Sequence, residues 1–298
     1  MSATSPKATL GIIGLGAMGG PMTRNFLAAG YTVHAADLDT ERLAAAQQHG
    51  ALASSDTAAL LAASDIVLTS LPSSDAFVAL TDQYLVPLAR PGQVFIDLGT
   101  TTPPETRRLA AALAQQQAAL LDVPVSGGPG GAEKGTLFMF AGGQQDLFEQ
   151  HLPLLQVLGD PDKITYCGPS GAGQVVKGVN QLMMGLVHAA HLEALAFGVR
   201  DGVAPEILLQ ALGSEGRWRR DLAQTTRAVA AGKGDEIGVK FRELPYFLRA
   251  AQDSNFPLPL TQLLYDFCDS GERVVIDDHR PAPSFWHQLM EGSYPTEE

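Results

Sequence analysis

Short apolar runs alternate with amphipathic stretches over the first half of the chain. Continuously apolar runs are typical of strands buried on both faces, whereas apolar residues spaced by three and four indicate helices. Helical patterns, such as those at 18–29 and 40–49, separate the runs. This alternation predicts βαβ units and a parallel sheet. The predicted strands lie at 9–15, 31–39, 65–71, 93–98, 120–125 and 137–141.

The pattern changes after Gly168. One helical pattern runs over 172–200, and strand signals almost disappear from there to the C-terminus. We therefore expect an α/β fold with a doubly wound domain over 1–168 and an all-helical domain over 169–298, entered by the long interdomain helix. The shorter helices are predicted at 205–213, 219–231, 243–253 and 258–270, separated by glycine and proline.

The composition is that of a soluble globular protein with an acidic balance. Of the 298 residues 45% are hydrophobic, and 32 Asp and Glu against 20 Lys and Arg give a formal net charge of −12. Nucleic-acid affinity depends largely on Lys and Arg that neutralise phosphates, so no nucleic-acid partner is expected. The basic stretch at 217–220 is interpreted as a solvated turn. The apolar stretch at 182–199 contains His188, His191 and Glu193, so we expect a buried helix and no membrane partner.

Cysteine usage and the N-terminus indicate the compartment. Cys167 and Cys268 have neither metal-ligand spacing nor the density of a disulfide framework, so we expect no metal and a reducing, cytoplasmic location. The first residues suit a first β-strand better than a secretory signal.

A glycine motif joins the first predicted strand to the first predicted helix. Gly14, Gly16 and Gly19 have the spacing that allows a tight turn, a close approach of backbone to pyrophosphate, and packing of helix on strand. The helix N-terminus then offers free N–H groups to the phosphates. At the end of the second strand, Asp37 is placed to accept hydrogen bonds from the adenosine ribose; ordinary helix capping is the alternative. The motif and Asp37 together predict a Rossmann-like domain. Since the charge of Asp37 repels a ribose 2′-phosphate, we predict that this domain binds NAD in preference to NADP.

The residues around this motif resemble the N-terminal signature of the β-hydroxyacid dehydrogenases, the family related to 3-hydroxyisobutyrate dehydrogenase. Three later segments are similar to further motifs of the family, in the same order over nearly the whole chain. They are 97–100 (DLGT), which borders the nicotinamide, 122–137, which begins DVPVSGG and binds the substrate, and 171–180, which is catalytic. The residues of the first signature are Gly14, Leu15, Gly16, Met18, Gly19, Pro21, Met22 and Asn25.

The resemblance implies an enzyme that interconverts a small β-hydroxyacid and its semialdehyde. Lys177 would be the general acid/base and Asn180 would orient the lysine or the substrate; Asn180 and Gln181 share a helix face with Lys177. A protonated lysine serves aldehyde reduction directly, whereas alcohol oxidation would benefit from alkaline pH. The implied substrate-binding residues are Ser126, Gly127, Gly128 and Gln181, the first three as a carboxylate cradle at a strand end. The implied cofactor-binding residues are Gly14, Leu15, Gly16, Ala17, Met18, Gly19, Asp37, Leu71, Pro72, Thr100, Lys240 and Arg242.

The sequence departs from the family pattern at three places. Gly99 stands where serine is common, so one hydrogen bond to the cofactor is missing or comes from Thr101. Either Lys240 or Arg242 takes the place of a second family lysine, and the sequence leaves open which. The pair Asn180-Gln181 replaces two asparagines and is similar to the branch that acts on tartronate semialdehyde (2-hydroxy-3-oxopropionate).

Two other functions suit the same fold. Imine reductases share the architecture but replace the catalytic lysine, which this chain retains at Lys177. A non-catalytic dinucleotide-binding protein would not need that lysine together with the Ser-Gly-Gly segment. The helix over 172–200 carries more apolar surface than one copy of the chain can cover, so we also predict a homodimer or homotetramer formed through the helical domain.

Overall fold

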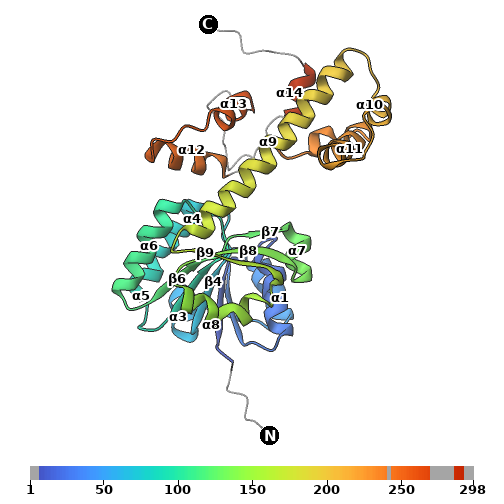
Figure 1. The fold of residues 1–298 in the computed structure, drawn as a ribbon. Coiled ribbons are helices and arrows are strands. Elements are labelled where there is room, and N and C mark those ends of the chain that lie inside the picture. Colours follow the sequence, from blue (N-terminus) through green and yellow to red (C-terminus); the bar gives the residue numbers. More distant parts are fainter. Residues whose placement is uncertain (1–6, 240–242, 269–284, 292–298) are drawn as a thin grey trace. The chain divides into compact units, whose positions relative to one another are not determined.

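The computed structural model of the chain describes residues 7–239, 243–268 and 285–291 (Figure 1). The chain divides into two compact units, Met1–Gly178 and Val179–Glu298. This division falls within a long helix, α9 (Ala172–Arg200), whereas the domain boundary predicted at 168/169 precedes that helix. One continuous helix is therefore shared by both units.

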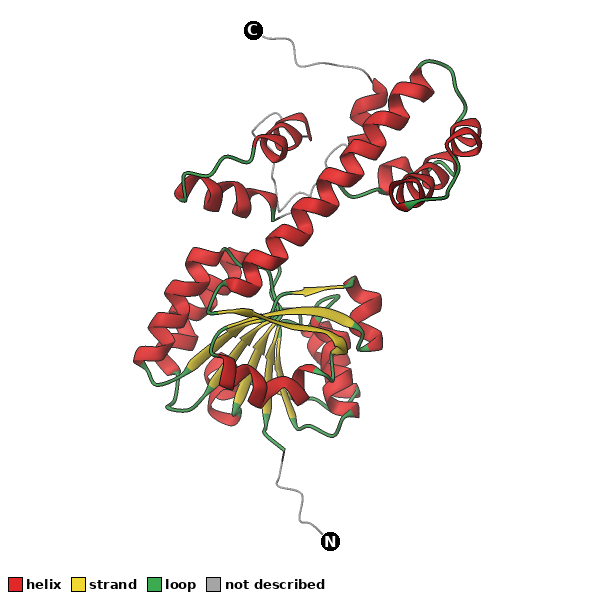
Figure 2. Cartoon of the chain, in the orientation of Figure 1, coloured by secondary structure: helices red, strands yellow, loops and turns green. Residues whose placement is uncertain are grey.

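A 9-stranded sheet forms the centre of the first unit (Figure 2). Its order is β3-β2-β1-β4-β5-β6-β8-β7, with β9 paired to β8. The neighbours from β3 to β6 are parallel, β8 is antiparallel to β6 and β7, and β9 is parallel to β8. Because β2 and β4 lie on opposite sides of β1, the sheet is doubly wound as predicted. The strands are β1 (Leu10–Ile13), β2 (Val33–Ala36), β3 (Leu52–Ala53), β4 (Ile66–Thr69), β5 (Val94–Asp97), β6 (Ala119–Asp122), β7 (Val125–Ser126), β8 (Leu137–Gly142) and β9 (Gly159–Gly168).

Both faces of the parallel strands are buried, which explains their continuously apolar sequences. Successive side chains along a strand point to opposite faces. Ile12 accordingly packs in one core cluster with Phe26, and its neighbour Ile13 packs in a second cluster with Leu109. The helices of this unit are α1 (Gly19–Ala28), α2 (Thr40–Gln48), α3 (Thr57–Ala63), α4 (Ser74–Leu80), the π-helical turn η1 (Thr81–Leu85), α5 (Val86–Leu88), α6 (Pro103–Gln115), α7 (Gly128–Lys134) and α8 (Gln145–Leu155).

Three strand predictions need correction. The strand predicted at 120–125 is two strands, β6 and β7, because Pro124 lies between them and has no N–H to donate to a sheet. The short strand β3 was not predicted, since Leu52 and Ala53 are both exposed and form no apolar run. Strand β9 was also missed, because it begins with the turn-like sequence Gly-Asp-Pro-Asp and is only partly buried.

Helices form the second unit throughout the residues that the structure describes. A core cluster joins α9 to later helices through side chains such as Leu192, Leu222 and Phe285. The later elements are α10 (Pro205–Leu212), α11 (Arg217–Ala230), the 3-10 turn η2 (Gly234–Glu236), α12 (Leu244–Asp253), α13 (Pro259–Cys268) and α14 (Phe285–Glu291). The predicted all-helical character is confirmed.

Helix α9 is not a buried helix, contrary to the expectation for its apolar stretch. By length and hydropathy it would suffice to cross a bilayer, and only 22% of its most apolar part is buried within the chain. Leu192 and Leu195 pack in the core, whereas Met183 is 58% exposed and Phe197 is 79% exposed. The helix therefore has a second apolar surface, which the chain itself leaves exposed.

Candidate active site

The predicted cofactor segments of the first unit lie together at the carboxyl edge of the parallel sheet. Five strands end there in register, at Ile13, Ala36, Thr69, Asp97 and Asp122. Each predicted cofactor segment of this unit begins just after one of these ends. Ligands of α/β sheets bind outside this edge, where the strand order reverses.

The three glycines of the first loop have different physical roles. Gly14 has φ +95°, and a Cβ there would lie 2.3 Å from the Ser70 carbonyl oxygen. A Cβ on Gly19 would lie 1.9 Å from the Gly14 oxygen, so both positions are required by the chain's own packing. A Cβ on Gly16 would meet only Arg42 Nη1, at 3.5 Å. The space beside Gly16 therefore fits a group from outside the chain, as a dinucleotide pyrophosphate at the start of α1 would be.

The other residues of the loop fix it in place. Leu15 is buried, Met18 packs against the core, and Ala17 is exposed at the tip of the loop. Asp37 accepts hydrogen bonds from Leu15 N at 2.5 Å and from Asp39 N at 2.8 Å. The carboxylate of Asp37 thus ties the glycine loop to the end of β2.

Helix capping, the alternative role for Asp37, is performed by Asp39 instead. Asp39 is the N-cap of α2 and accepts hydrogen bonds from Glu41 N and Arg42 N. The Arg42 side chain, which the sequence analysis did not single out, also pairs with Asp39 at 3.1 Å. Asp37 is therefore a loop anchor at the edge where the cofactor ribose is expected.

The loop after β5 carries one predicted cofactor residue, Thr100, on a buried support. Thr100 is partly exposed, whereas Thr101 is buried and donates its hydroxyl hydrogen bond to Asp97 Oδ2 at 2.9 Å. Thr101 thus uses its hydroxyl hydrogen and its N–H within the chain, which favours the alternative that the bond to the cofactor is missing. On the neighbouring strand end, Leu71 is partly buried and Pro72 is exposed.

Two buried carboxylates, which the sequence analysis quoted without a role, lie side by side at this edge. Asp97 and Asp122 are partners in the register of β5 and β6. Burial raises the pKa of Asp97 to about 6, against hydrogen bonds from Thr101, Gly99 and Thr69 that lower it. Burial likewise raises the pKa of Asp122 to about 6, and the charge of Asp97 adds to the increase. Burial thus opposes the ionised form of both carboxyl groups, and the hydrogen bonds that they accept favour it.

The start of helix α9 is fixed to the sheet by Asp122. Its carboxylate accepts hydrogen bonds from Gly171 N at 2.8 Å and from Gln174 N at 3.1 Å. A Cβ on Gly173 would lie 2.2 Å from the Phe140 oxygen, so only glycine allows the first turn to approach β8 this closely. The glycines of the catalytic segment therefore exist for helix-to-sheet packing.

Lys177 lies one turn along this helix, beside the predicted substrate segment. It is 7% exposed, and its Nζ donates a hydrogen bond to Val125 O at 2.7 Å. Val125 precedes Ser126, and Gly127 and Gly128 follow with φ of +132° and +61°. Apart from its chain neighbours, no atom of the described residues lies within 4 Å of a Cβ placed on Gly128. The structure thus brings the lysine and the Ser-Gly-Gly segment together, although they are far apart in the sequence.

The remaining predicted site residues fall into two groups. Asn180 is partly exposed and donates to Met184 Sδ at 3.5 Å. Gln181 is buried, and its Oε1 has no hydrogen-bond partner in the part of the chain that the structure describes. Lys240 and Arg242 lie outside the described residues.

Asn25 connects the glycine loop helix to the Ser-Gly-Gly helix. Its Nδ2 donates to Ala132 O at 2.8 Å, which joins α1 to α7. This bond explains a signature residue that pyrophosphate binding does not itself require.

Residues 9–168 match the family model described as the NAD binding domain of 6-phosphogluconate dehydrogenase. Residues 171–279 match that described as NAD-binding of NADP-dependent 3-hydroxyisobutyrate dehydrogenase. The 2-(hydroxymethyl)glutarate dehydrogenase of Eubacterium barkeri is 34% identical over 94% of this chain and 95% of its own length. The 3-hydroxyisobutyrate dehydrogenase of Pseudomonas aeruginosa is 35% identical over 72% of each.

The chain belongs to the β-hydroxyacid dehydrogenase family. The solved 3-hydroxyisobutyrate dehydrogenase of Mycobacterium tuberculosis agrees, with a TM-score of 0.79, 25% identity, and coverage of 95% of this chain and 98% of that one. An imine reductase of Myxococcus stipitatus shares the fold at a TM-score of 0.66 and 21% identity, covering 88% of this chain and 92% of that one. As a β-hydroxyacid dehydrogenase, the chain is an NAD(P)-dependent oxidoreductase that acts on a hydroxyl group of a small molecule.

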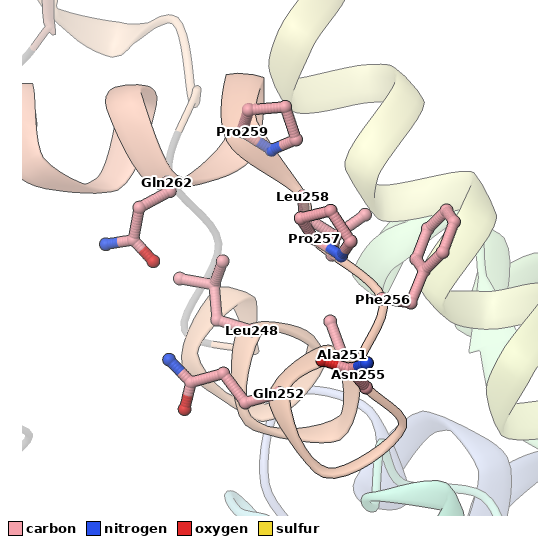
Figure 3. A pocket seen from close by; sticks show the side chains of 9 residues that line it. All are labelled: Leu248, Ala251, Gln252, Asn255, Phe256, Pro257, Leu258, Pro259 and Gln262. Atoms are coloured by element: carbon pink, nitrogen blue, oxygen red, sulfur yellow. The ribbon is translucent and has the colours of Figure 1, made fainter.

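The second unit of this dehydrogenase contains a cavity whose described lining includes none of the predicted site residues. It has a volume of about 510 Å³ and lies between α12 and α13 (Figure 3). The described residues that line it have apolar or amide side chains. The lining residues are Leu248, Ala251, Gln252, Asn255, Phe256, Pro257, Leu258, Pro259 and Gln262.

Alanine substitutions at two glycines should separate folding from cofactor binding. Gly19→Ala should lower the free energy of unfolding by about 1–3 kcal/mol, because its methyl group meets the Gly14 backbone. Gly16→Ala should leave stability within about 0.5 kcal/mol of wild type. It should nevertheless weaken NADH binding by at least about tenfold, since its methyl group fills the phosphate space. Denaturant unfolding and NADH fluorescence titration measure the two effects. Equal NADH affinity in Gly16→Ala and wild type would contradict the assignment.

Proposed function

We propose that this β-hydroxyacid dehydrogenase interconverts a primary alcohol placed β to a carboxylate and the corresponding semialdehyde, with Lys177 as the general acid/base. The observation that carries the proposal is the 2.7 Å hydrogen bond from Lys177 Nζ to Val125 O, next to Ser126. It puts a buried proton donor beside backbone and hydroxyl groups suited to a carboxylate. A substrate whose carboxylate binds at Ser126 to Gly128 would have its reacting oxygen within reach of the lysine.

Different residues of the chain would bind the cofactor, transfer the proton and bind the substrate. The glycine loop, Asp37 and the loop at Thr100 would hold the dinucleotide, whose nicotinamide supplies or accepts the hydride when bound. In the reductive direction, the Lys177 ammonium gives a proton to the carbonyl oxygen; in oxidation, the neutral amine takes the hydroxyl proton. Ser126 and the backbone of Gly127 and Gly128 fix the carboxylate. Asn180 and Gln181, at i+3 and i+4 from the lysine, orient the polar groups of the substrate.

The names of the relatives narrow the substrate class. 3-Hydroxyisobutyrate, 2-(hydroxymethyl)glutarate and L-serine, named for three dehydrogenases 34–35% identical to this chain, all carry a hydroxymethyl group on the carbon that bears a carboxylate. The substituents on that carbon differ. A shared carboxylate cradle and lysine with a variable pocket would account for both facts. Small hydroxyacids of this type and the corresponding semialdehydes, tartronate semialdehyde among the latter, are therefore the proposed substrates.

Turnover of a substrate panel by wild type and a Lys177→Ala variant tests the proposal. Wild type should oxidise NADH with small semialdehydes and not with cyclic imines. Lys177→Ala should lower kcat by about 10²–10⁴-fold, the usual contribution of general acid–base catalysis. NADH affinity should stay close to wild type, because the lysine acts on the substrate oxygen.

Lys134→Ala is the matched control, since this lysine ends α7 near the same segment but is exposed, whereas Lys177 is buried. Its kcat should equal that of wild type. A Lys177→Ala enzyme with normal kcat would refute the role of the lysine. Binding of NADH with no turnover of any carbonyl would instead favour a non-catalytic dinucleotide-binding protein, and turnover of imines alone would favour the imine-reductase alternative.

NAD is the proposed cofactor in preference to NADP. The Asp37 carboxylate is fixed at the end of β2 by two backbone N–H groups, so it cannot turn away from a ribose 2′-phosphate without releasing the loop. The nearby guanidinium of Arg42 is paired with Asp39. The negative charge of Asp37 therefore opposes binding of the ribose 2′-phosphate of NADP.

An Asp37→Asn variant should reduce this preference. It removes the negative charge and keeps one oxygen acceptor for the loop. The ratio of kcat/KM for NADP⁺ to that for NAD⁺ should rise by about tenfold or more, as expected for the loss of a charge repulsion of about 1–4 kcal/mol. Asp56→Asn, at the N-cap of α3, is the control and should leave the ratio unchanged. A wild-type enzyme that prefers NADP⁺ would overturn the assignment.

We infer that a second copy of the chain covers the exposed apolar side chains of α9. Val179 and Met183 are each 58% exposed on the same helix that packs its other side into a core cluster. A bilayer would be a poor partner, because Lys177 and Gln181 are buried polar residues on the same helix. A homodimer or homotetramer therefore suits this surface.

A charge placed on this surface should dissociate the oligomer. Wild type should sediment as a dimer or tetramer, and Met183→Glu should sediment as a smaller species, since a buried unpaired charge opposes association. Leu88→Glu, on an exposed apolar residue of α5, should not change the sedimentation. Monomeric wild type at micromolar concentration, or recovery of the protein with phospholipid vesicles, would refute the inference.

A further inference from the structure

Gln174 forms a hydrogen-bonded bridge between helix α9 and the loop after β5. Its side chain is fully buried, three residues before Lys177 on the same helix. Oε1 accepts a hydrogen bond from Thr101 N at 3.0 Å, and Nε2 donates one to Gly99 O at 3.1 Å. We call this side chain with its two bonds the amide bridge. The sequence analysis assigned no role to Gln174.

The amide bridge fixes the backbone on both sides of Thr100. One planar amide group takes the carbonyl before this residue and the N–H after it, so a rotation of the loop at Thr100 breaks at least one bond. The end of β5 also supports the loop, because Asp97 Oδ1 accepts hydrogen bonds from Gly99 N at 3.1 Å and from Thr69 Oγ1 at 3.0 Å. Thr100, the residue expected at the nicotinamide, is thus held with little freedom.

The other end of the bridge is equally fixed. Gln174 N donates to Asp122, which anchors the first turn of α9 to β6. Lys177 follows less than one turn later and donates to Val125 O. The amide bridge therefore spans from the predicted cofactor loop to the helix turn that carries the lysine, through one buried and one part-buried hydrogen bond.

We propose that Gln174 is a positioning residue that sets the cofactor loop at Thr100 against Lys177. The proposal rests on the function proposed above, in which hydride and proton reach one carbonyl group from these two sides. Both donors must then be held in one geometry, and a misplacement of about 1 Å costs about 10²-fold in rate. An amide satisfies both loop groups, whereas an apolar side chain of equal length would fill the space and leave them unpaired.

Two substitutions of similar shape test the bridge. Gln174→Met removes both hydrogen bonds. Gln174→Glu keeps the acceptor for Thr101 N, and it regains a donor to Gly99 O only when the new carboxyl group is protonated. The charged groups around this position are Asp97 on β5, Asp122 on β6 and Lys177 on the same helix, with Arg107 of α6 near the start of α9. The two buried carboxylates favour protonation of the substituted glutamate.

Gln93→Met is the matched control. Gln93 is also buried, and its Nε2 donates to Leu61 O and Ser64 O, each at 2.9 Å, just before β5 at the opposite edge of the sheet. Loss of this amide should lower Tm about as much as Gln174→Met does. It should leave kcat unchanged, because it supports no segment of the candidate site.

We expect Gln174→Met to lower kcat by about 10- to 100-fold with a smaller change in the semialdehyde KM. In the cofactor-free protein, amide hydrogen exchange at Thr101 should be faster than in wild type. The kcat of Gln174→Glu relative to wild type should rise as the pH is lowered from about 8.5 to about 6, as protonation restores the missing donor. Comparison with wild type at each pH isolates the pH dependence that the substitution introduces, including its coupling to Asp97 and Asp122.

Wild-type kcat together with wild-type exchange at Thr101 in Gln174→Met would overturn the proposal. If Gln174→Met does not fold, the pH dependence of Gln174→Glu decides, and a constant ratio to wild type refutes the bridge. The proposed function fails separately, through an active Lys177→Ala enzyme. In that case the exchange rate at Thr101 still decides whether Gln174 fixes the loop.

Discussion

The hydrogen bonds from the first turn of α9 to the buried carboxylate of Asp122 are the interaction on which the candidate site depends. They attach a long helix to one strand end, so the position of Lys177 follows from the sheet. The ionised carboxylate faces backbone N–H groups and the positive end of the helix dipole, which offsets part of its desolvation. The offset is incomplete. Since the pKa values of Asp97 and Asp122 are raised from 3.8 to about 6, the fold binds more protons than the unfolded chain between these values, and their contribution to stability falls as pH rises through that window.

Close approach of backbone segments is the second constraint, and it separates glycines that serve the fold from glycines that serve a ligand. Gly19 and Gly173 both allow a helix to start in contact with the carboxyl edge, where a methyl group would meet a carbonyl oxygen. Gly16 and Gly128 meet no such obstacle within the chain. Under the proposed function, the absence of a side chain would leave room for the phosphates at Gly16 and for the substrate carboxylate at Gly128. Glycine thus meets two different physical requirements in this chain.

The sequence was sufficient for the local elements and for the order of the site segments, but not for the buried polar groups that join them. Apolar runs marked the parallel strands because both faces of the sheet are covered. Strand β3 was not predicted because its two residues are exposed. The apolar run at 120–125 was predicted as one strand, whereas Pro124 separates it into β6 and β7. The pairing of Asp97 with Asp122 depends on strand register, and the bonds of Gln174 cross 73 and 75 residues of sequence. No local pattern encodes contacts of that range, although all three residues lie inside motifs that the sequence analysis quoted.

Helix α9 shows why the apolar pattern alone was misleading about burial. Along its first half, the buried positions other than glycines are polar, namely Gln174, Lys177 and Gln181, while the exposed positions include Val175 and Val179. An ordinary surface helix has the reverse arrangement. The inversion follows if the polar residues serve a site inside the protein and the apolar residues serve a contact outside the single chain. Catalysis and assembly would then be encoded on opposite sides of one helix, so that a partner covering the apolar side would also limit the movement of the turn that carries the lysine.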